Sequence, residues 1–323
     1  MGKAAQFIRD WMLPGAIVLG IGLYFTYRAL PVLHPYGHIL HTAASEGQRV
    51  VIALLLFFQF VRISPHDVHL TRWHFAALGF QFLMFLGFAA LAALTPQGEI
   101  RILLECAMLC LICPTASAAG VITEKLGGSL ADVVSYITMS NVLATFMIPL
   151  VIPMVKPSEA LDFWAYVGHI ALRVFPLLVL PGALAWLIRY TTHKLQRRLM
   201  RISNYSFYFW GVGLTLAMLL STRALVLSGL GAGAVACVVL VSMGCCAVQF
   251  FTGRHLGRTR AENLSAGQSL GQKNTGFLIW LGYNYMTPVT CVAGGLYAVW
   301  QNIFNSWQLY RHFHSGQEPS ADR

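Results

Sequence analysis

The sequence predicts an all-α, polytopic membrane protein. Of its 323 residues, 57% are hydrophobic and only 11% are charged, whereas soluble globular proteins carry about 25% charged residues. Apolar runs near the length of about 20 residues that a membrane-crossing helix needs recur along the whole chain. We therefore expect one transmembrane domain over residues 1–323, ending in a short polar tail at 312–323.

Charged residues divide the apolar sequence into ten candidate spans. The second is short, and the arginines at its two ends would have to extend their side chains to the membrane surface. The fourth contains a proline, and the ninth is rich in glycine and polar residues. The ten expected spans cover residues 11–27, 50–61, 73–94, 102–123, 133–155, 163–187, 202–222, 224–251, 265–283 and 288–309.

Basic residues are distributed unevenly between alternate loops. With ten spans, most of the 22 Lys and Arg residues fall on the side that carries both termini. Because cytoplasmic loops collect Lys and Arg, we expect both termini in the cytoplasm of a multi-pass protein of the bacterial inner membrane. The net charge of +10 then reflects topology and contact with membrane lipid, not binding to nucleic acid, and the oligomeric state stays open.

Lys273 lies in a polar, glycine-rich stretch at 265–276, near the middle of the ninth span. Inserting a charged side chain at that depth costs roughly 2.5–3.5 kcal/mol, so it is expected only where it faces a cavity, a partner or a ligand. Three roles follow. Lys273 could be a counter-charge for an anionic substrate, a titrating group that couples transport to protons, or a structural partner of Glu105, Glu124 or Asp132.

The fourth span contains a second irregular segment, Cys113-Pro-Thr-Ala-Ser-Ala-Ala-Gly120. If the chain consists of two five-span halves, about 1–156 and 157–311, the fourth and ninth spans occupy equivalent positions. Five is odd, so the two halves would be inverted relative to each other. Irregular backbone survives at membrane depth only where it lines a cavity or is buried in protein, and paired interruptions of this kind indicate a transport site.

No catalytic motif supports an enzyme. Gly267-Gln-Ser-Leu-Gly271 matches the Gly-x-Ser-x-Gly pattern, but a nucleophile elbow needs a strand-to-helix turn, and this stretch lies in an expected span. The sequence has no His-Glu-x-x-His motif and no Walker loop. We expect no enzymatic activity, no cofactor and no structural metal site.

The chain resembles the bile acid:sodium symporter family over most of its length. Gln81 looks like the family's span-three glutamine, which helps to hold a sodium ion. The resemblance implies ten spans in two inverted halves, with broken spans four and nine crossing, and a panel of spans one, two, six and seven against a core of the others. It is carried by Cys113-Pro114 with the small residues after it, Gly127-Gly128, Pro149 and Gly271-x-x-Asn274-x-Gly276.

The departures from the family pattern concern the sodium ligands. A gap after Pro114 would place Ser117 at the family's serine position, and a shift in span five could bring Ser135 or Thr138 into the site. Most of the oxygen ligands are missing and a cation stands among them, which implies weakened or absent sodium coupling. Without gaps, the family's ligands fall on Ala119 and Gly120 in span four, Val133 and Ile137 in span five, and Ser269 and Lys273 in span nine.

We therefore expect a secondary transporter that moves a small organic anion by alternating access, with its site between the two breaks. Two alternatives stay open, namely a non-transporting receptor or subunit that retains the fold and a conventional sodium-coupled symporter. The expected substrate or coupling residues are Gln81, Thr115, Ser117, Ser269, Gln272, Lys273 and Asn274. The expected irregular backbone lies at Pro114, Ala119, Gly120 and Gly271.

Overall fold

The computed structural model describes residues 3–287 and 289–314, which form helices and short connections without a strand. The prediction of an all-α protein is confirmed for these residues. Six helical stretches are long and apolar enough to cross a membrane, as a multi-pass membrane protein requires: 31–62, 72–94, 130–155, 163–191, 206–227 and 232–253. Pro288, where the tenth expected span begins, and residues 315–323 of the expected tail lie outside the described residues.

Fourteen α-helices are described, and the loop between α6 and α7 coincides with the expected boundary between the halves. The first half contains α1 (Lys3–Ala29), α2 (Gly37–Arg62), α3 (Arg72–Leu94), α4 (Glu99–Ile112), α5 (Ala118–Lys125) and α6 (Leu130–Val155). The second half contains α7 (Phe163–Leu178), α8 (Leu180–Thr191), α9 (His193–Ile202), α10 (Ser206–Leu227), α11 (Ala232–Gly253), α12 (Arg260–Gly271), α13 (Thr275–Tyr285) and α14 (Thr290–His314). Three short 3-10 turns also occur, η1 (Pro31–Tyr36), η2 (Pro65–Asp67) and η3 (Ser203–Tyr205).

Helix α2 begins well before the predicted second span, 50–61. Glu46 and Arg49 lie inside it and pair across one turn, with Oε2 and Nη2 2.8 Å apart. An i,i+3 pair of this kind lets a helix continue through charged residues, although the same charges lower the local hydropathy.

Besides a single-residue break at Val179 in the sixth predicted span, two longer interruptions lie inside predicted spans, between Ile112 and Ala118 and between Gly271 and Thr275. Pro114 has no N–H group and cannot continue a helix through the first interruption. After the second, the Asn274 side chain caps α13 by accepting the Phe277 N–H at 3.2 Å. Both interruptions occur where the proline and the polar residues of the sequence predicted them.

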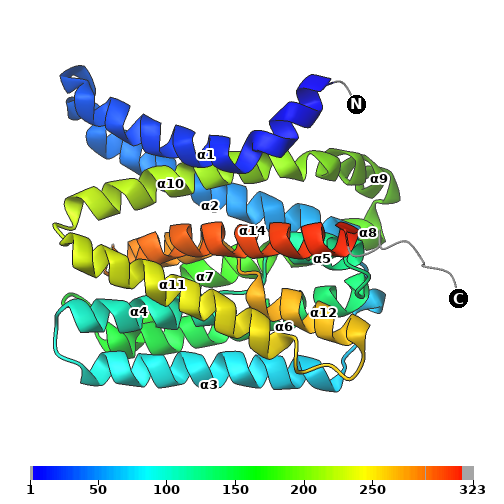
Figure 1. The fold of residues 1–323 in the computed structure, drawn as a ribbon. Helices are drawn as coiled ribbons and strands as arrows, with labels where there is room; N and C mark the ends of the chain where they lie inside the picture. The colour runs from blue at the N-terminus through cyan, green and yellow to red at the C-terminus, as the bar shows by residue number, and fades with distance from the viewer. Residues whose placement is uncertain (1–2, 288, 315–323) are drawn as a thin grey trace, which may run out of the picture.

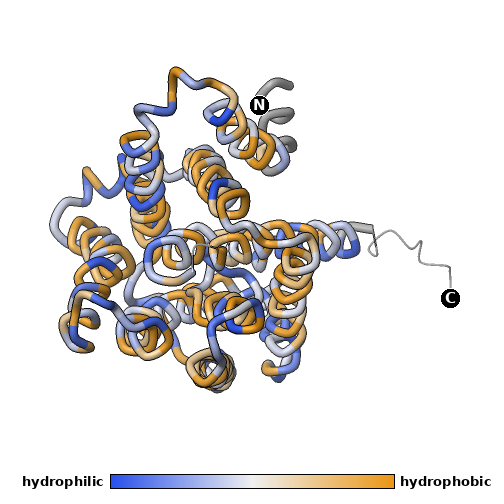
Figure 2. The backbone as a smooth tube through the Cα atoms, turned by 90° about the vertical axis from the view of Figure 1, so that its left-hand side faces the viewer, coloured by the Kyte–Doolittle hydropathy of each residue, from blue (hydrophilic) through white to orange (hydrophobic). Residues whose placement is uncertain are grey.

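The helices form two layers (Figure 1). In one, α1 packs on α10, α10 on α2, and α2 on α8. In the other, α3 packs on α4 and α6, while α11 packs on α4, α12 and α14. Helix α7 contacts α6 of the second layer and α8 of the first. Figure 2 shows the helices end-on, with hydrophobic residues along most of them.

Large apolar side chains cover the outer surface. Leu83 on α3 and Leu172 on α7 are 67% and 79% exposed, and Phe146 on α6 is also exposed. Many large hydrophobic side chains are exposed in this way along the helices. Such side chains are unfavourable in water, whereas contact with lipid chains carries no such penalty.

Candidate functional site

The two interruptions lie side by side and form hydrogen bonds with each other. Ala116 N–H donates to Gln272 C=O at 3.0 Å, and Asn274 N–H donates to Pro114 C=O at 2.8 Å. The result is an isolated antiparallel bridge in which Thr115 lies opposite Lys273, and we call this contact between the two breaks the crossover. Since an unsatisfied backbone group costs several kcal/mol in an apolar surrounding, each break satisfies groups that the other leaves open.

Buried side chains hold this crossover from both sides. The Thr115 hydroxyl donates to Ser269 C=O at 2.6 Å. The Gln301 amide of α14 accepts the Lys273 N–H at 2.8 Å and donates to the Lys273 C=O at 3.3 Å. One side chain therefore satisfies both backbone groups of the residue whose ammonium is the most unusual feature of the sequence.

Gln81 of α3 holds the start of the first break in place through hydrogen bonds to its backbone. Its Nε2 donates to Ile112 C=O at 2.8 Å and to Cys113 C=O at 3.3 Å. Its Oε1 accepts the Tyr136 hydroxyl at 2.8 Å. Gln81 is fully buried and satisfies carbonyls at the C-terminal end of α4.

The Lys273 side chain is 0% exposed. Its Nζ has no hydrogen-bond partner among the described residues, and none of the ion pairs formed within them includes it. An ammonium buried without a counter-ion is costly, so a ligand that supplies negative charge would be favoured here.

The three carboxylates considered as structural partners of Lys273 lie elsewhere. Glu105 Oε1 faces Arg101 Nε at 3.5 Å, and Asp132 Oδ1 lies 2.5 Å from His69 Nε2. Glu124 is exposed. The structural-partner role is therefore wrong for these three residues.

A pocket lies between the two layers, beside the crossover. Its wall on the first layer is mainly apolar, and its wall on the second is mainly polar. The first wall contains Gln48, Val51, Ile52, Leu55 and Leu56 of α2 and Trp210, Gly213, Leu214 and Ala217 of α10. The second contains residues 116–118 and 272–276 of the two breaks, with Gln301 and Asn302 of α14.

Four of the predicted substrate or coupling residues belong to this wall, namely Ser117, Gln272, Lys273 and Asn274. The other three, Gln81, Thr115 and Ser269, are not part of it and are fully buried behind it. Gln81, Thr115 and Ser269 hold the crossover in place through hydrogen bonds to the backbone, with Thr115 donating to the Ser269 C=O.

Of the four positions predicted to have irregular backbone, Pro114 lies inside an interruption and Gly271 lies directly before the other one. Gly271 ends α12, where its C=O accepts the Tyr297 hydroxyl at 2.8 Å. Ala119 and Gly120 lie instead in the first turn of α5.

Sequence reasoning missed Gln48 and Gln301. The Gln48 amide donates to Gly276 C=O at 3.0 Å and so joins the two layers beside the pocket. A usable signal existed for Gln301, because Gln301-Asn302 places two amides inside an apolar span. Gln48 lies just before the predicted second span and carried no such signal.

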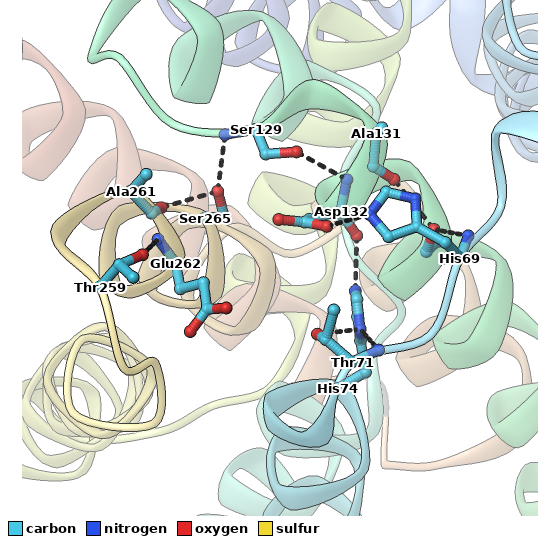
Figure 3. A network of polar contacts seen from close by, with 11 residues as sticks. His69, Thr71, His74, Ser129, Ala131, Asp132, Thr259, Ala261, Glu262 and Ser265 are labelled. Atoms are coloured by element: carbon cyan, nitrogen blue, oxygen red, sulfur yellow. Dashed lines mark hydrogen bonds and ion pairs between the residues drawn. The ribbon is translucent and has the colours of Figure 1, made fainter.

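A second polar cluster joins α3, α6 and α12 away from the pocket (Figure 3). The His74 ring lies 2.8 Å from Asp132 C=O, and the Asp132 carboxylate faces His69. Ser129 N–H donates to Ser265 Oγ at 2.8 Å. The cluster fixes the start of α12 against the first half of the chain.

The pocket wall collects three sources of positive potential. Besides Lys273, it includes Ala118 and Thr275, the first residues of α5 and α13. A helix N-terminus carries a partial positive charge. The arrangement can therefore hold an anion.

No protein-family model matches the chain, and no curated protein matches it.

Proposed function

We propose that this chain is a secondary transporter that moves a small organic anion by alternating access. The observation that carries the proposal is the Lys273 ammonium, which has no partner among the described residues and lies at the crossing of two broken helices, beside a pocket between two layers. A substrate anion would supply the missing negative charge. Movement of one layer against the other would expose the pocket to the two sides of the membrane in turn.

The proposed fold has ten spans in two inverted five-helix halves, as in the bile acid:sodium symporters that the sequence resembles. In this assignment α4 with α5, α7 with α8, and α12 with α13 each form one span, and α9 lies outside the count. The antiparallel pairing of the two breaks supports halves that run in opposite directions.

The proposed orientation places both termini in the cytoplasm, in the bacterial inner membrane. The start of α1, helix α9, the start of α12 and the end of α14 lie at the same end of the molecule (Figure 1). Basic residues concentrate in the connections at this end, including Lys125, Arg197 and Arg258. The distribution of Lys and Arg supports this orientation.

The experiment that tests the proposal is uptake into proteoliposomes that contain the purified protein. Radiolabelled monocarboxylates and a sulfonated steroid conjugate serve as probes. We expect saturable uptake of at least one probe and its loss in Lys273→Gln. Lys125→Gln, which removes an exposed lysine, should transport normally.

Two outcomes would contradict this proposal. Normal uptake by Lys273→Gln would remove Lys273 from the mechanism. Binding of a probe, seen as a rise in the melting temperature, without uptake of any probe would favour the receptor or subunit alternative.

The proposed coupling is sodium-independent, with the Lys273 ammonium in the place of a bound sodium ion. Thermal stability measured across a sodium titration should therefore equal that measured in choline at the same ionic strength. A ligand that binds the folded state raises stability in proportion to RT ln(1 + [L]/Kd). A saturable rise specific to sodium would contradict the lysine substitution and favour a conventional symporter.

A further inference from the structure

Helix α9 differs from the helices around it in composition. It contains Lys194, Arg197, Arg198 and Arg201, and none of its residues is buried. Because successive helical residues are offset by about 100°, these four cations fall on one face. A helix this short is marginally stable on its own in water, so contacts with its surroundings must stabilise it.

A face of α9 next to the cationic one is apolar and contains Leu195, Leu199 and Ile202. Leu199 packs against the cluster of Phe60, Val61 and Ala185 and attaches α9 to the first layer. Leu195 and Ile202, which are 40% and 44% exposed, form an apolar edge beside the cationic face. A helix with a cationic face and an adjoining apolar edge is typical of segments that lie in the plane of a membrane surface.

The cations of α9 have no acidic partner among the residues that the structure describes. None of the ion pairs within the described residues involves them. The sequence contains no Asp or Glu between Asp162 and Glu262, so every helix from α7 to α11 lacks a carboxylate. Within the described residues this face is therefore left without a counter-charge, and the phosphate of a lipid could supply one.

The apolar edge of α9 continues an apolar surface that leads toward the membrane. Leu180, Leu184 and Leu187 are exposed along α8, which ends two residues before α9 begins. Helix α9 packs on α2, α8 and η3, and it lies at the end of the first layer in Figure 1. A bilayer covering α8 would place its headgroups beside α9.

We propose that α9 is an interfacial helix that binds the phosphate groups of anionic phospholipids and thereby holds the layer of α1, α2, α8 and α10 at the membrane surface. The exposed apolar edge selects a bilayer as the source of the phosphate, because a free phosphate ion would leave that edge in water. This binding does not depend on which anion is transported.

The test is a lipid titration of the purified full-length protein in detergent, read by its melting temperature. Phosphatidylglycerol should raise the melting temperature saturably, and the rise should shrink in high salt because surface charges are screened. Phosphatidylcholine at equal concentration should give a smaller rise. In the variant R197Q/R198Q/R201Q the apparent affinity for phosphatidylglycerol should fall by at least about tenfold.

The matched control removes three exposed cations from other connections, in the variant K125Q/R258Q/R260Q. This control should keep the wild-type affinity for phosphatidylglycerol. The charge-conserving variant R197K/R198K/R201K should keep most of that affinity, which would show that α9 still folds when its three arginines are replaced. Equal losses in the two Gln variants would overturn the proposal, because charge alone would then explain binding. If inorganic phosphate raised the melting temperature as much as phosphatidylglycerol does, the proposal would also be overturned, because binding would then need no lipid.

Discussion

The Lys273 side chain combines complete burial with the absence of a partner for Nζ among the described residues. Burying a polar group without a hydrogen-bond partner costs about 1–3 kcal/mol in protein mutational data, and an apolar side chain of similar size removes that cost. We therefore expect Lys273→Met to raise the free energy of unfolding by about 1–3 kcal/mol while transport is lost. Thermal or denaturant unfolding in detergent measures the change.

Lys125→Met is the control for this substitution, because it adds the same side chain at an exposed position and should change stability little. If Lys273→Met instead lowers stability, the ammonium has a structural counterpart in the protein and is not held ready for a ligand.

Gln301 acts on the backbone of Lys273 through two hydrogen bonds. Gln301→Leu removes both and leaves a buried N–H without a partner, which should cost about 2–3 kcal/mol of stability. Asn302→Leu changes the next residue, whose amide donates within its own helix to Ala298 C=O, and should cost less than half as much. If Gln301→Leu and Asn302→Leu lowered the melting temperature equally, the two hydrogen bonds from Gln301 to the Lys273 backbone would make no specific contribution to stability.

Helices α11 and α12 approach so closely that glycine is required at their contact. A Cβ added to Gly253 would lie 2.5 Å from Ala266 C=O, whereas one added to Gly244 of the same helix would meet nothing within 4 Å. Gly253→Ala should therefore cost about 1–3 kcal/mol through forced separation of the helices. Gly244→Ala should be neutral or stabilising by up to about 1 kcal/mol. Denaturant unfolding of the two variants compares them directly.

The elements differ in how far the sequence could predict them. The breaks were predictable because Pro114 and the polar residues around Lys273 are unfavourable in a continuous membrane helix. The start of α2 was not, because the charges of Glu46 and Arg49 lower hydropathy but pair within the helix. Helix α9 lies in a basic stretch before and at the start of the predicted span 202–222, and composition alone does not separate a loop from an interfacial helix.

The site was predictable only where its chemistry is unusual within a span. Ser117, Gln272, Lys273 and Asn274 were identified from local sequence and share one wall of the pocket. The roles of Gln48 and Gln301 depend on which backbone groups lie opposite them, at Gly276 and Lys273. Those contacts join distant parts of the chain, and a single sequence contains no record of them.

At the scale of the whole molecule, the proposal requires the two layers to move relative to each other. Ser221 of α10 and Gly295 of α14 belong to different layers, and a Cβ on Gly295 would lie 3.7 Å from the Ser221 Cβ. That separation suits a disulfide. In the double variant Ser221→Cys/Gly295→Cys we expect oxidation to stop transport and a reductant to restore it, measured as uptake into proteoliposomes.

A second pair gives the matched control, because it lies within one layer. A Cβ on Gly213 of α10 would be 3.9 Å from the Val51 Cβ of α2. Because Val51 and Gly213 also line the pocket, the reduced form of Val51→Cys/Gly213→Cys is the reference, and oxidation should leave uptake near the level of that form. Uptake that survives the cross-link between layers would rule out their relative movement as the transport step.

The mutual pairing of the two breaks also has a consequence for biosynthesis. Cys113 Sγ donates to Asn274 C=O across a separation of 161 residues, and the backbone bonds of the crossover span a similar length. At about 5–20 residues per second, the ribosome supplies the second partner roughly ten seconds or more after the first. During that interval the nascent first half has exposed carbonyl and amide groups inside the bilayer. An insertase or a neighbouring protein that shields residues 113–117 would therefore matter more for this chain than for one built from uninterrupted helices.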